Sequence, residues 1–483
     1  MTYFRQIYDE GLSQAAYIIG DPSTRQAVVV DPLRDIDLYL DHAANKGYEI
    51  VGVLETHIHA DFLSGGRELA MSTGATFYIS GETVEGWEYG ALDGLDVVEL
   101  RDGDTFDVGD GIEIKALHTP GHTPEEMSYL VVEKGNGDDP MAVLTGDFMF
   151  VGDLGRPDLL EEAAGEEGTA EPGARQTFQS MTSGFLELPD YVAVWPGHGS
   201  GSACGKALGD VPSSTIGYEK RTAWWSEFFE NNNEDGFVKE FLSDQPESPT
   251  YYANMKTWNR DGASILGELP SPSRLTPKRF HQLAESDDTW IMDLRDFRSF
   301  ARGHLPGSIN FAKLKELSNQ AGRLAPYGKN LVLVAEPSQI EEATRRLIRI
   351  GLDDIVGFVP ASRIGQYATG ELDTFPVVDD PDEAFELYQQ DNTRIVDVRS
   401  IGERSRGYIP ESQHAYYGNI PQMLAEAEER GEAPKGEKVI VHCEAGARAT
   451  VAASYLQAHG FDDIVLYTGG FGGWKKKGHP VEK

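Results

Sequence analysis

Three potential metal ligands, His57, His59 and Asp61, lie within a span of five residues in this sequence. They follow the apolar run Ile50–Leu54, which predicts a buried strand, so the ligands should lie on the loop that leaves it. Imidazole and carboxylate groups at this spacing indicate a metal site. The next residue is Phe62, whose phenyl ring cannot coordinate an ion.

Three later segments place a His or Asp in a turn or just past an apolar strand: Leu117–Pro124 with His122, Leu144–Phe150 with Asp147, and Val194–Gly199 with His198. The order and spacing of the four segments resemble the metallo-β-lactamase superfamily, whose first motif is His-x-His-x-Asp-His. In that superfamily the Asp and the last His of the motif serve a second metal ion. Phe62 therefore predicts a site for a single ion.

The resemblance also implies a ligand set. In the iron enzymes of the superfamily the ligands correspond to His57, His122 and Asp147. Two imidazoles and one carboxylate with open positions opposite suit non-haem Fe(II) and O₂, so we expect one Fe(II) per chain, with Zn as the alternative. The remaining candidates would form hydrogen bonds to these ligands, or they would be remnants of a lost second metal site. They are His59, Asp61 and His198.

The segment Gly155–Asp158, soon after Asp147, resembles the persulfide dioxygenases, relatives of glyoxalase II in which an arginine lies near the iron. Arg156 would then hold an aspartate and shape the pocket, or form a structural ion pair, and both interpretations stay open. Cys204 follows the His198 segment in a loop rich in Gly and Ser. The nearby Lys206 would favour a thiolate and a role in sulfur transfer, against the alternative of a small buried hydrophobic residue.

A second constellation begins at Cys443. The apolar run Val439–His442 predicts a strand that leads into Cys443, and a loop to Arg448 then opens a predicted helix at Ala449–His459. Backbone N–H groups at a helix N-terminus lower the pKa of a thiol and stabilise a persulfide. The pattern Cys-x-x-Gly-x-Arg resembles the active loop of rhodaneses. This implies that Cys443 carries sulfane sulfur and that Arg448 adds positive charge at the rim.

The last ~210 residues contain an internal repeat, with the domain sizes expected of small α/β units. Trp290–Arg295 matches Arg394–Arg399, and Gly351–Val356 matches Gly460–Val465. Strands that alternate with helices predict a parallel sheet in each copy. Leu331–Gln339 takes the place of the Cys443 loop but has no Cys, Gly or closing Arg, so the first copy should be an inactive rhodanese-like domain.

The expected fold class is therefore α/β: an αββα metallo-β-lactamase sandwich followed by two α/β rhodanese-like domains. We predict domains at 1–255, 275–373 and 377–483. A surface loop is predicted at Leu160–Arg175, and a linker at Gln245–Pro277, because both are rich in turn-forming residues.

The formal net charge of −37, from 42 basic and 79 acidic residues, argues against nucleic acid or an anionic membrane as the main partner. A salt-rich host cytoplasm is one hypothesis for it. Two cysteines exclude a disulfide framework. The N-terminus lacks the pattern of a signal peptide, and no apolar run approaches the ~20 residues of a membrane span. These features predict a cytoplasmic protein, and we expect a homo-oligomer.

The whole chain resembles bacterial fusions of a persulfide dioxygenase, an inactive rhodanese and an active rhodanese. This implies oxidation of a low-molecular-weight thiol persulfide, of glutathione or coenzyme A type, by O₂ to sulfite. Cys443 would transfer sulfur to or from thiosulfate, in sulfide detoxification. Two alternatives stay open: a zinc-dependent thioester hydrolase of glyoxalase II type, and a sulfur-relay protein that does not oxidise its cargo.

Overall fold

The computed structural model describes residues 2–159, 161, 168–430 and 436–483. The chain divides into two compact units, Met1–Leu269 with Ile348–Gly351, and Pro270–Leu347 with Leu352–Lys483. Among the described residues, no helix is long and apolar enough to cross a lipid bilayer. The borders between the three expected domains stay predictions.

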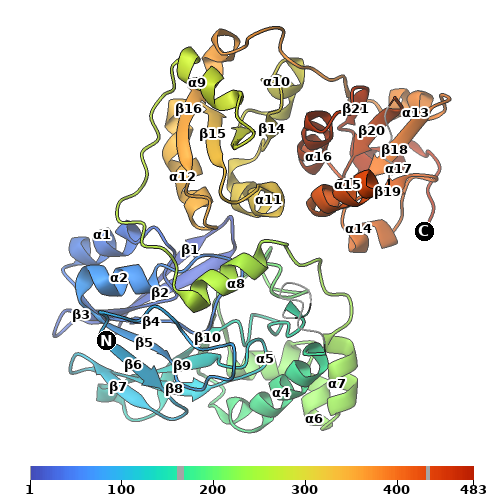
Figure 1. The fold of residues 1–483 in the computed structure, drawn as a ribbon. Coiled ribbons are helices and arrows are strands. Elements are labelled where there is room, and N and C mark those ends of the chain that lie inside the picture. Colours follow the sequence, from blue (N-terminus) through green and yellow to red (C-terminus); the bar gives the residue numbers. More distant parts are fainter. Residues whose placement is uncertain (1, 160, 162–167, 431–435) are drawn as a thin grey trace. The chain divides into compact units, whose positions relative to one another are not determined.

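The first unit contains two six-stranded mixed sheets (Figure 1). The first sheet has the order β1 (Tyr3–Asp9), β2 (Gln14–Asp21), β3 (Gln26–Val30), β4 (Glu49–Leu54), β5 (Thr76–Ser80) and β6 (Val97–Leu100). The second has the order β12 (Ser214–Thr215), β11 (Ala193–Pro196), β10 (Pro140–Gly146), β9 (Met127–Glu133), β8 (Ile112–His118) and β7 (Thr105–Val108). The predicted strand before the metal motif is β4.

Three apolar clusters show how the layers of this unit pack. One joins the facing sides of the two sheets, with Tyr17 of β2 and Tyr129 of β9 among its members. A second joins the outer face of the first sheet to α1 (Asp37–Lys46) and α2 (Gly66–Thr73). A third joins the outer face of the second sheet to later helices. They are α4 (Ala170–Thr182), α5 (Ile216–Thr222), α6 (Ser226–Glu230) and α7 (Glu234–Phe241). The unit is therefore an αββα sandwich, as predicted.

Two segments predicted as irregular contain helices. Of the predicted surface loop, Leu160 and residues 162–167 lie outside the described residues, but Ala170–Arg175 begins α4, which buries Ala174, Phe178 and Met181 at helical spacing. The predicted linker contains α8 (Tyr252–Asp261), which buries Tyr252, Met255 and Lys256. The prolines that suggested a linker flank α8 without interrupting it. The three-residue spacing of the apolar residues Tyr252 and Met255 indicated the helix better than the prolines indicated a linker.

The second unit contains two parallel sheets, one for each copy of the repeat. The first copy has strands in the order β14 (Ile309–Asn310), β13 (Thr289–Asp293), β15 (Asn330–Ala335) and β16 (Ile355–Pro360), with α9 (Pro277–Ala284), α10 (Phe297–Arg302), α11 (Leu317–Leu324) and α12 (Ile340–Ile348). The second has the order β17 (Val377–Val378), β21 (Ile464–Tyr467), β20 (Lys438–His442), β18 (Thr393–Asp397) and β19 (Gln413–His414). Its helices are α13 (Pro381–Tyr388), α14 (Ile401–Ser405), α15 (Ile420–Glu429), α16 (Ala447–Ala458) and α17 (Gly470–Lys477).

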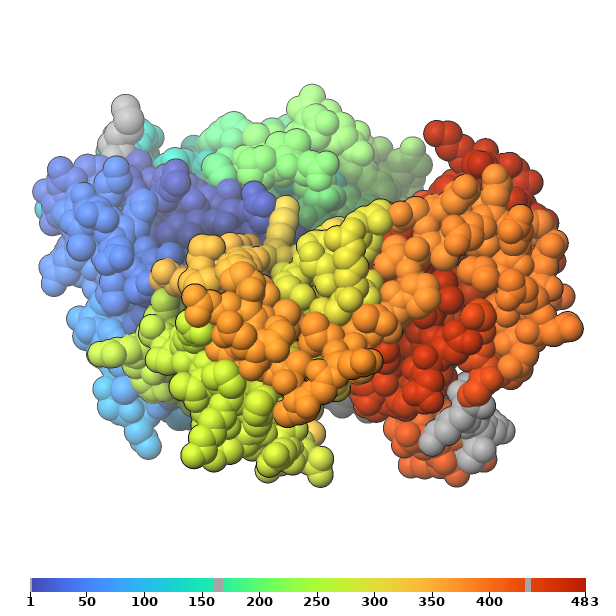
Figure 2. Space-filling view, turned by 90° about the horizontal axis from the view of Figure 1, so that it is seen from above, coloured from blue at the N-terminus to red at the C-terminus, as the bar shows by residue number. Residues whose placement is uncertain are grey.

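The two copies pack against each other within this unit, where yellow and orange-to-red parts of the chain meet (Figure 2). Helix α16 contacts β14 of the first copy, and the Asn310 N–H donates to Ser454 Oγ at 3.0 Å. The imidazole of His304 lies 2.9 Å from Gln457 Oε1. The helix that starts at the Cys443 loop is therefore supported by the first copy.

Candidate metal centre and sulfur-carrier loop

The metal centre lies where three strands of the sandwich end. His57 follows β4 of the first sheet, while His122 and Asp147 follow β8 and β10 of the second. All three side chains are buried, and one ligand atom from each lies within 4.8 Å of the others. His122 Nε2 is 3.7 Å from Asp147 Oδ2. The fold thus brings together the three residues predicted to hold one metal ion.

Hydrogen bonds fix the tautomer of both imidazoles. His122 Nδ1 lies 2.9 Å from the carbonyl oxygen of Arg156, which only accepts, so Nδ1 carries the proton. The Thr56 hydroxyl donates to Asp31 at 2.9 Å and is therefore left to accept from His57 Nδ1, also at 2.9 Å. In both rings Nε2 keeps its lone pair. Metal-binding histidines are typically oriented in this way, with one ring N–H donating to the protein and the other ring nitrogen left for the metal.

Asp147 offers a carboxylate oxygen that the protein leaves unpaired. Its Oδ1 is 2.7 Å from His198 Nδ1, whereas Oδ2 is buried without a hydrogen-bond partner. Burial would raise the pKa of Asp147, but His198 and the two other imidazoles nearby lower it below its usual range. An ionised, buried and unpaired oxygen beside two Nε2 lone pairs fits a cation, so the donor set suits a resident metal ion.

His198 is held between two carboxylates. Its Nδ1 lies 2.7 Å from Asp147, and its Nε2 lies 2.7 Å from Asp61. Burial opposes its charged form, but Asp147 and Asp61 raise the pKa of His198 well above its usual range. Both ring nitrogens then carry protons, and the ring supports Asp147 from behind.

The His59 ring packs against that of His57, with ring centres 4.2 Å apart, and its Nε2 is directed toward two other acids. Its Nε2 is 3.2 Å from Asp31 and 3.3 Å from Glu55. The ring of Phe62 lies against it, with ring centres 4.4 Å apart, so an apolar side chain fills the place of the sixth motif residue. Burial opposes the imidazolium form, but Asp31 and Glu55 raise the pKa of His59 well above its usual range.

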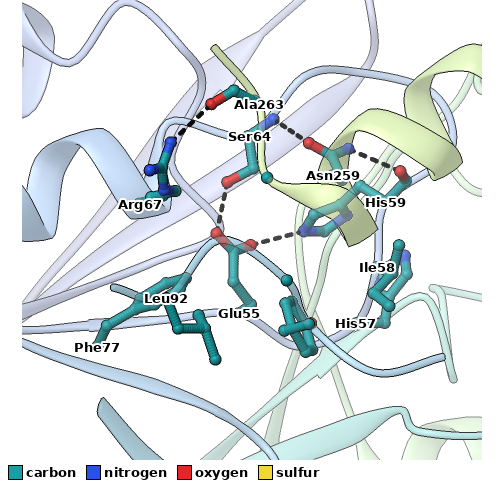
Figure 3. Close-up of a pocket in the computed structure, with 13 residues that line it drawn as sticks. Glu55, His57, Ile58, His59, Ser64, Arg67, Phe77, Leu92, Asn259 and Ala263 are labelled. Atoms are coloured by element: carbon teal, nitrogen blue, oxygen red, sulfur yellow. Dashed lines mark hydrogen bonds and ion pairs between the residues drawn. The ribbon is translucent and has the colours of Figure 1, made fainter. Parts of the chain in front are cut away.

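Helix α8 holds the backbone of the metal loop through Asn259, a residue that sequence reasoning missed. Asn259 Nδ2 donates to the carbonyl oxygens of His59 and Phe62, both at 2.7 Å, and Oδ1 accepts from Ser64 N–H at 2.9 Å. The close-up shows Asn259 between the two sides of the loop, with Ser64 turned toward Glu55 (Figure 3). One side chain thus satisfies three backbone groups of the loop. Because Asn259 is 200 residues away from His59 in the sequence, no local pattern indicates this contact.

Arg156 contributes to the site through its backbone and not by pointing at the ligands. Its buried guanidinium makes a two-pronged ion pair with Asp158, at 2.8 and 2.6 Å. Its carbonyl oxygen is the acceptor that orients His122. The geometry agrees with the structural ion pair, one of the two interpretations of the sequence.

Cys204 differs from the sequence expectation. Lys206 does not face it, because the ammonium lies 2.6 Å from the Glu240 carbonyl oxygen and over the Trp224 ring. Burial raises the pKa of the Cys204 thiol well above its usual range, and the charges of Asp147 and Asp61 raise it further. Lys206 is therefore not placed to favour a thiolate at Cys204. It does lie at the metal centre, with its sulfur within 4.8 Å of ligand atoms of Asp61 and His198.

The sulfur-carrier loop connects β20 to α16. Cys443 Sγ accepts a hydrogen bond from Gly446 N–H at 3.1 Å, and Gly446, with φ of 95°, precedes the first residue of α16. That backbone conformation suits glycine and turns the amide toward the sulfur. Arg448 donates to both carboxylate oxygens of Glu403, at 2.5 and 2.7 Å. Burial raises the pKa of Glu403, but this ion pair overrides burial and lowers it to about 2.

The two copies share one scaffold up to this loop. In the second copy the Arg399 guanidinium donates to Asp397 and, at 2.9 Å, to the Gly407 carbonyl oxygen. In the first copy the Arg295 guanidinium donates in the same way to Asp293 and, at 2.9 Å, to the Gly303 carbonyl oxygen. In the first copy, the pairing of β13 with β15 places Val334 opposite Asp293. In the second copy, the pairing of β18 with β20 places His442 opposite Asp397. Ala335 therefore occupies the position of Cys443, and the capping box Glu336–Gln339 replaces the active loop.

Comparison with known proteins agrees with this architecture. The model of the metallo-beta-lactamase superfamily matches residues 9–198, and that of the rhodanese-like domain matches 276–360 and 380–477. A hydroxyacylglutathione hydrolase of Polaromonas sp. is 30% identical over 326 residues, which cover 63% of this chain and 94% of its own length. The cytoplasmic hydroxyacylglutathione hydrolase of Arabidopsis thaliana is 36% identical over 183 residues, 38% of this chain and 62% of its own length.

Among solved structures, a metallo-beta-lactamase from Staphylococcus aureus subsp. aureus COL is 39% identical, with a TM-score of 0.66. It covers 74% of this chain, and 98% of its own length is matched. The chain therefore belongs to the metallo-β-lactamase superfamily and carries rhodanese-like domains after its αββα sandwich.

Proposed function

We propose that the chain oxidises a low-molecular-weight thiol persulfide with O₂ at an Fe(II) site and transfers sulfane sulfur at Cys443. The observation that carries this proposal is the donor set: two Nε2 lone pairs and one unpaired carboxylate oxygen converge, while His59 and His198 are each held by carboxylates. A 2-His-1-carboxylate set with open positions is typical of non-haem Fe(II) enzymes that use O₂.

In the oxidation, one persulfide, one O₂ and one water give one thiol, one sulfite and two protons. The outer sulfur loses four electrons, and O₂ gains them. His57, His122 and Asp147 would hold Fe(II), which when bound brings O₂ and the terminal sulfur together and passes the electrons. Arg156 and Thr56 keep Nε2 of the two imidazoles deprotonated. His198 holds Asp147 in place, and the Phe62 ring packs against His59.

In the transfer, the Cys443 thiolate attacks the outer sulfur of a second persulfide, and the parent thiol leaves. Sulfite then attacks the sulfur bound to Cys443, so thiosulfate leaves and the thiolate is restored. The Gly446 amide and the N-terminus of α16 stabilise negative charge on the sulfur. The same steps run in reverse with thiosulfate as the donor. We also assign to Cys204 a role in handling sulfur at the metal centre, because its sulfur lies within 4.8 Å of ligand atoms of Asp61 and His198.

Protein purified without oxygen and loaded with Fe(II) tests the oxidation. With glutathione persulfide or coenzyme A persulfide we expect O₂ uptake and, in the Cys443→Ser variant, sulfite as the sulfur product. Absence of O₂ uptake with every persulfide would reject the dioxygenase.

A zinc-dependent thioester hydrolase is the second candidate, favoured by the 30% identity to a hydroxyacylglutathione hydrolase over 94% of that protein's length. It predicts two metal ions per chain and hydrolysis of S-lactoylglutathione. The same protein preparation, assayed with this thioester and analysed for zinc, separates the two functions.

A further inference from the structure

A four-residue turn that follows α12 in the sequence lies against the metal loop. The turn, Ile348–Gly351, comes between α12 and β16 of the first copy, yet it belongs to the first compact unit. The carbonyl oxygen of Arg349 accepts a hydrogen bond from Leu63 N–H at 2.7 Å. Leu63 directly follows Phe62, so the turn supplies an acceptor to the loop that begins at the metal ligand His57.

The peptide group between Phe62 and Leu63 is held on both sides. Its carbonyl oxygen accepts from Asn259 Nδ2 at 2.7 Å, and its N–H donates to the Arg349 carbonyl oxygen, also at 2.7 Å. Both residues are buried, so an amide that lost its acceptor would find no water in its place. The two hydrogen bonds fix the backbone next to Asp61, whose carboxylate bonds the imidazole that supports the carboxylate ligand.

The side chain of Arg349 fixes the turn through a buried ion triad. Its guanidinium donates to both carboxylate oxygens of Asp35, at 2.8 and 2.6 Å, and to Asp9 at 2.5 Å. Arg349 is 7% exposed, and both carboxylates are buried as well. The planar, two-pronged pairing with Asp35 restricts the orientation of the arginine. Asp9 is the last residue of β1 and Asp35 precedes α1, so the Arg349 carbonyl is held relative to the first sheet.

Gly351 lets the turn approach α8, the helix that contains Asn259. Its φ of 74° lies in the left-handed region, and a Cβ atom at this position would lie 2.5 Å from the ring of Trp258. The turn therefore lies directly against Trp258, while the next residue of the helix, Asn259, bonds the metal loop. Helix and turn thus pack together and hold the same peptide group.

We propose that Arg349 is a positioning residue of the metal centre. Asp9 and Asp35 hold its side chain, and its backbone carbonyl in turn holds the Leu63 N–H. Together with Asn259, it sets the orientation of the metal loop. The inference concerns metal binding, so it applies to Fe(II) and Zn(II) alike and does not depend on persulfide oxidation.

Hydrogen exchange and metal affinity of the full-length protein test this role. In the metal-free protein, Arg349→Met should speed exchange of the Leu63 amide by about 10-fold, whereas amides of β3 and β4 should stay as protected as in wild type. Competition with a chromophoric chelator should show Fe(II) and Zn(II) bound about 10- to 100-fold more weakly. Arg349→Lys keeps a charge between the carboxylates and should restore most of the affinity.

Gly351→Ala tests the same turn without removing a charge. The added Cβ would collide with Trp258 and displace the Arg349 carbonyl, so Leu63 exchange should speed up and both metals should bind about 10-fold more weakly. Gly328→Ala is the matched control, because Gly328 has a φ of 78° and open space at its Cβ position. It should change neither measurement.

A second control and a fold check complete the design. Arg298→Met removes an exposed guanidinium that pairs with Asp379 and should leave Leu63 exchange and metal affinity unchanged. If Arg349→Met does not fold because two buried carboxylates lose their partner, Gly351→Ala decides. Unchanged Leu63 exchange in Gly351→Ala, or wild-type metal affinity despite faster exchange, would overturn the proposal.

The pattern of exchange separates positioning from general stability. Equal acceleration in the metal loop, β3 and β4 would assign the turn to the stability of the whole fold and would also overturn the proposal. None of these measurements uses O₂ or a persulfide. Absence of O₂ uptake would therefore reject the dioxygenase and leave the role of Arg349 standing, and unchanged metal affinity with O₂ uptake would do the reverse.

Discussion

The metal centre gathers His57, His122 and Asp147 from the ends of three strands in two sheets, whereas the sulfur-carrier loop takes Cys443, Gly446 and Arg448 from six consecutive residues. The ligands of the metal centre need neighbours such as Thr56 and Arg156 to set their tautomers and orientations. The loop supplies its own backbone amides. Substitutions far away in sequence should therefore disturb the metal ligands more than the amide that faces the Cys443 sulfur, because that amide belongs to the loop itself.

The largest expected effect is the loss of a ligand. His122→Ala removes a metal ligand, so Fe(II) binding and O₂ uptake with persulfide should fall to background. Sulfur transfer from thiosulfate to cyanide through Cys443 should stay at the wild-type level. His118→Ala is the matched control, because His118 bonds the Pro124 carbonyl instead of facing the ligands. Loss of sulfur transfer in His122→Ala would show that the two sites are not independent.

The reciprocal substitution is Cys443→Ser. A hydroxyl cannot carry sulfane sulfur, so sulfur transfer should be abolished while O₂ uptake continues. The product should change from thiosulfate to sulfite, measured by separating the two anions after turnover. Enzymatic thiosulfate formation by this variant would mean that another group carries the sulfur.

Asn259→Ala tests the dependence of the metal centre on distant residues. Losing three hydrogen bonds to the metal loop should weaken Fe(II) affinity by about 10- to 100-fold, as substitutions behind metal ligands do. Metal competition with a chromophoric chelator measures this, and sulfur transfer should not change. Asn231→Ala, which removes an amide bonded only to a surface carbonyl, is the control. Unchanged Fe(II) affinity in Asn259→Ala would contradict the role of α8.

A smaller effect is expected at the rim of the loop. The pKa of Glu403 is lowered to about 2 from an ordinary 4.5, so its ion pair with Arg448 stabilises the fold above pH 4.5 and is lost as the pH falls toward 2. Glu403→Gln should speed hydrogen exchange of α16 amides at pH 7, and the difference from wild type should shrink below pH 4.5. A difference that stays the same between pH 7 and pH 2 would point to another cause.

The smallest effect is expected from Ala335→Cys, which places a thiol at the position equivalent to Cys443. Glu336, the next residue, forms a capping box with Gln339, and Pro337 has no N–H to donate. The loop that follows the new sulfur therefore lacks the amide arrangement of the Cys443 loop. Tested together with Cys443→Ser, it should restore no measurable sulfur transfer. Restored transfer would mean that the scaffold, not the loop, confers reactivity.

Much of the fold could be predicted from the sequence because apolar runs mark its buried strands. The run at Ile50–Leu54 and the Cys443 loop each carry their signal within a few residues, and both form where expected. The three metal ligands could be named because each lies in a recognisable turn. Their convergence is visible in the packed sheets, not in their spacing.

The remaining features depend on contacts between residues far apart in sequence. Asn259 reaches His59 across 200 residues, and its helix lies between prolines that predicted a linker. Burial and the charges of Asp147 and Asp61 raise the pKa of the Cys204 thiol, whereas proximity in sequence pointed to Lys206. Such side-chain environments follow from packing and are not encoded in a local pattern.

Metal analysis combined with an oxygen electrode tests most directly whether a single Fe(II) oxidises the persulfide. Protein purified anaerobically should contain one Fe(II) per chain. It should consume one O₂ for every two glutathione or coenzyme A persulfides, whichever is the substrate, because the sulfur of the second persulfide ends in thiosulfate. Two zinc ions per chain, with thioester hydrolysis and no O₂ uptake, would contradict it.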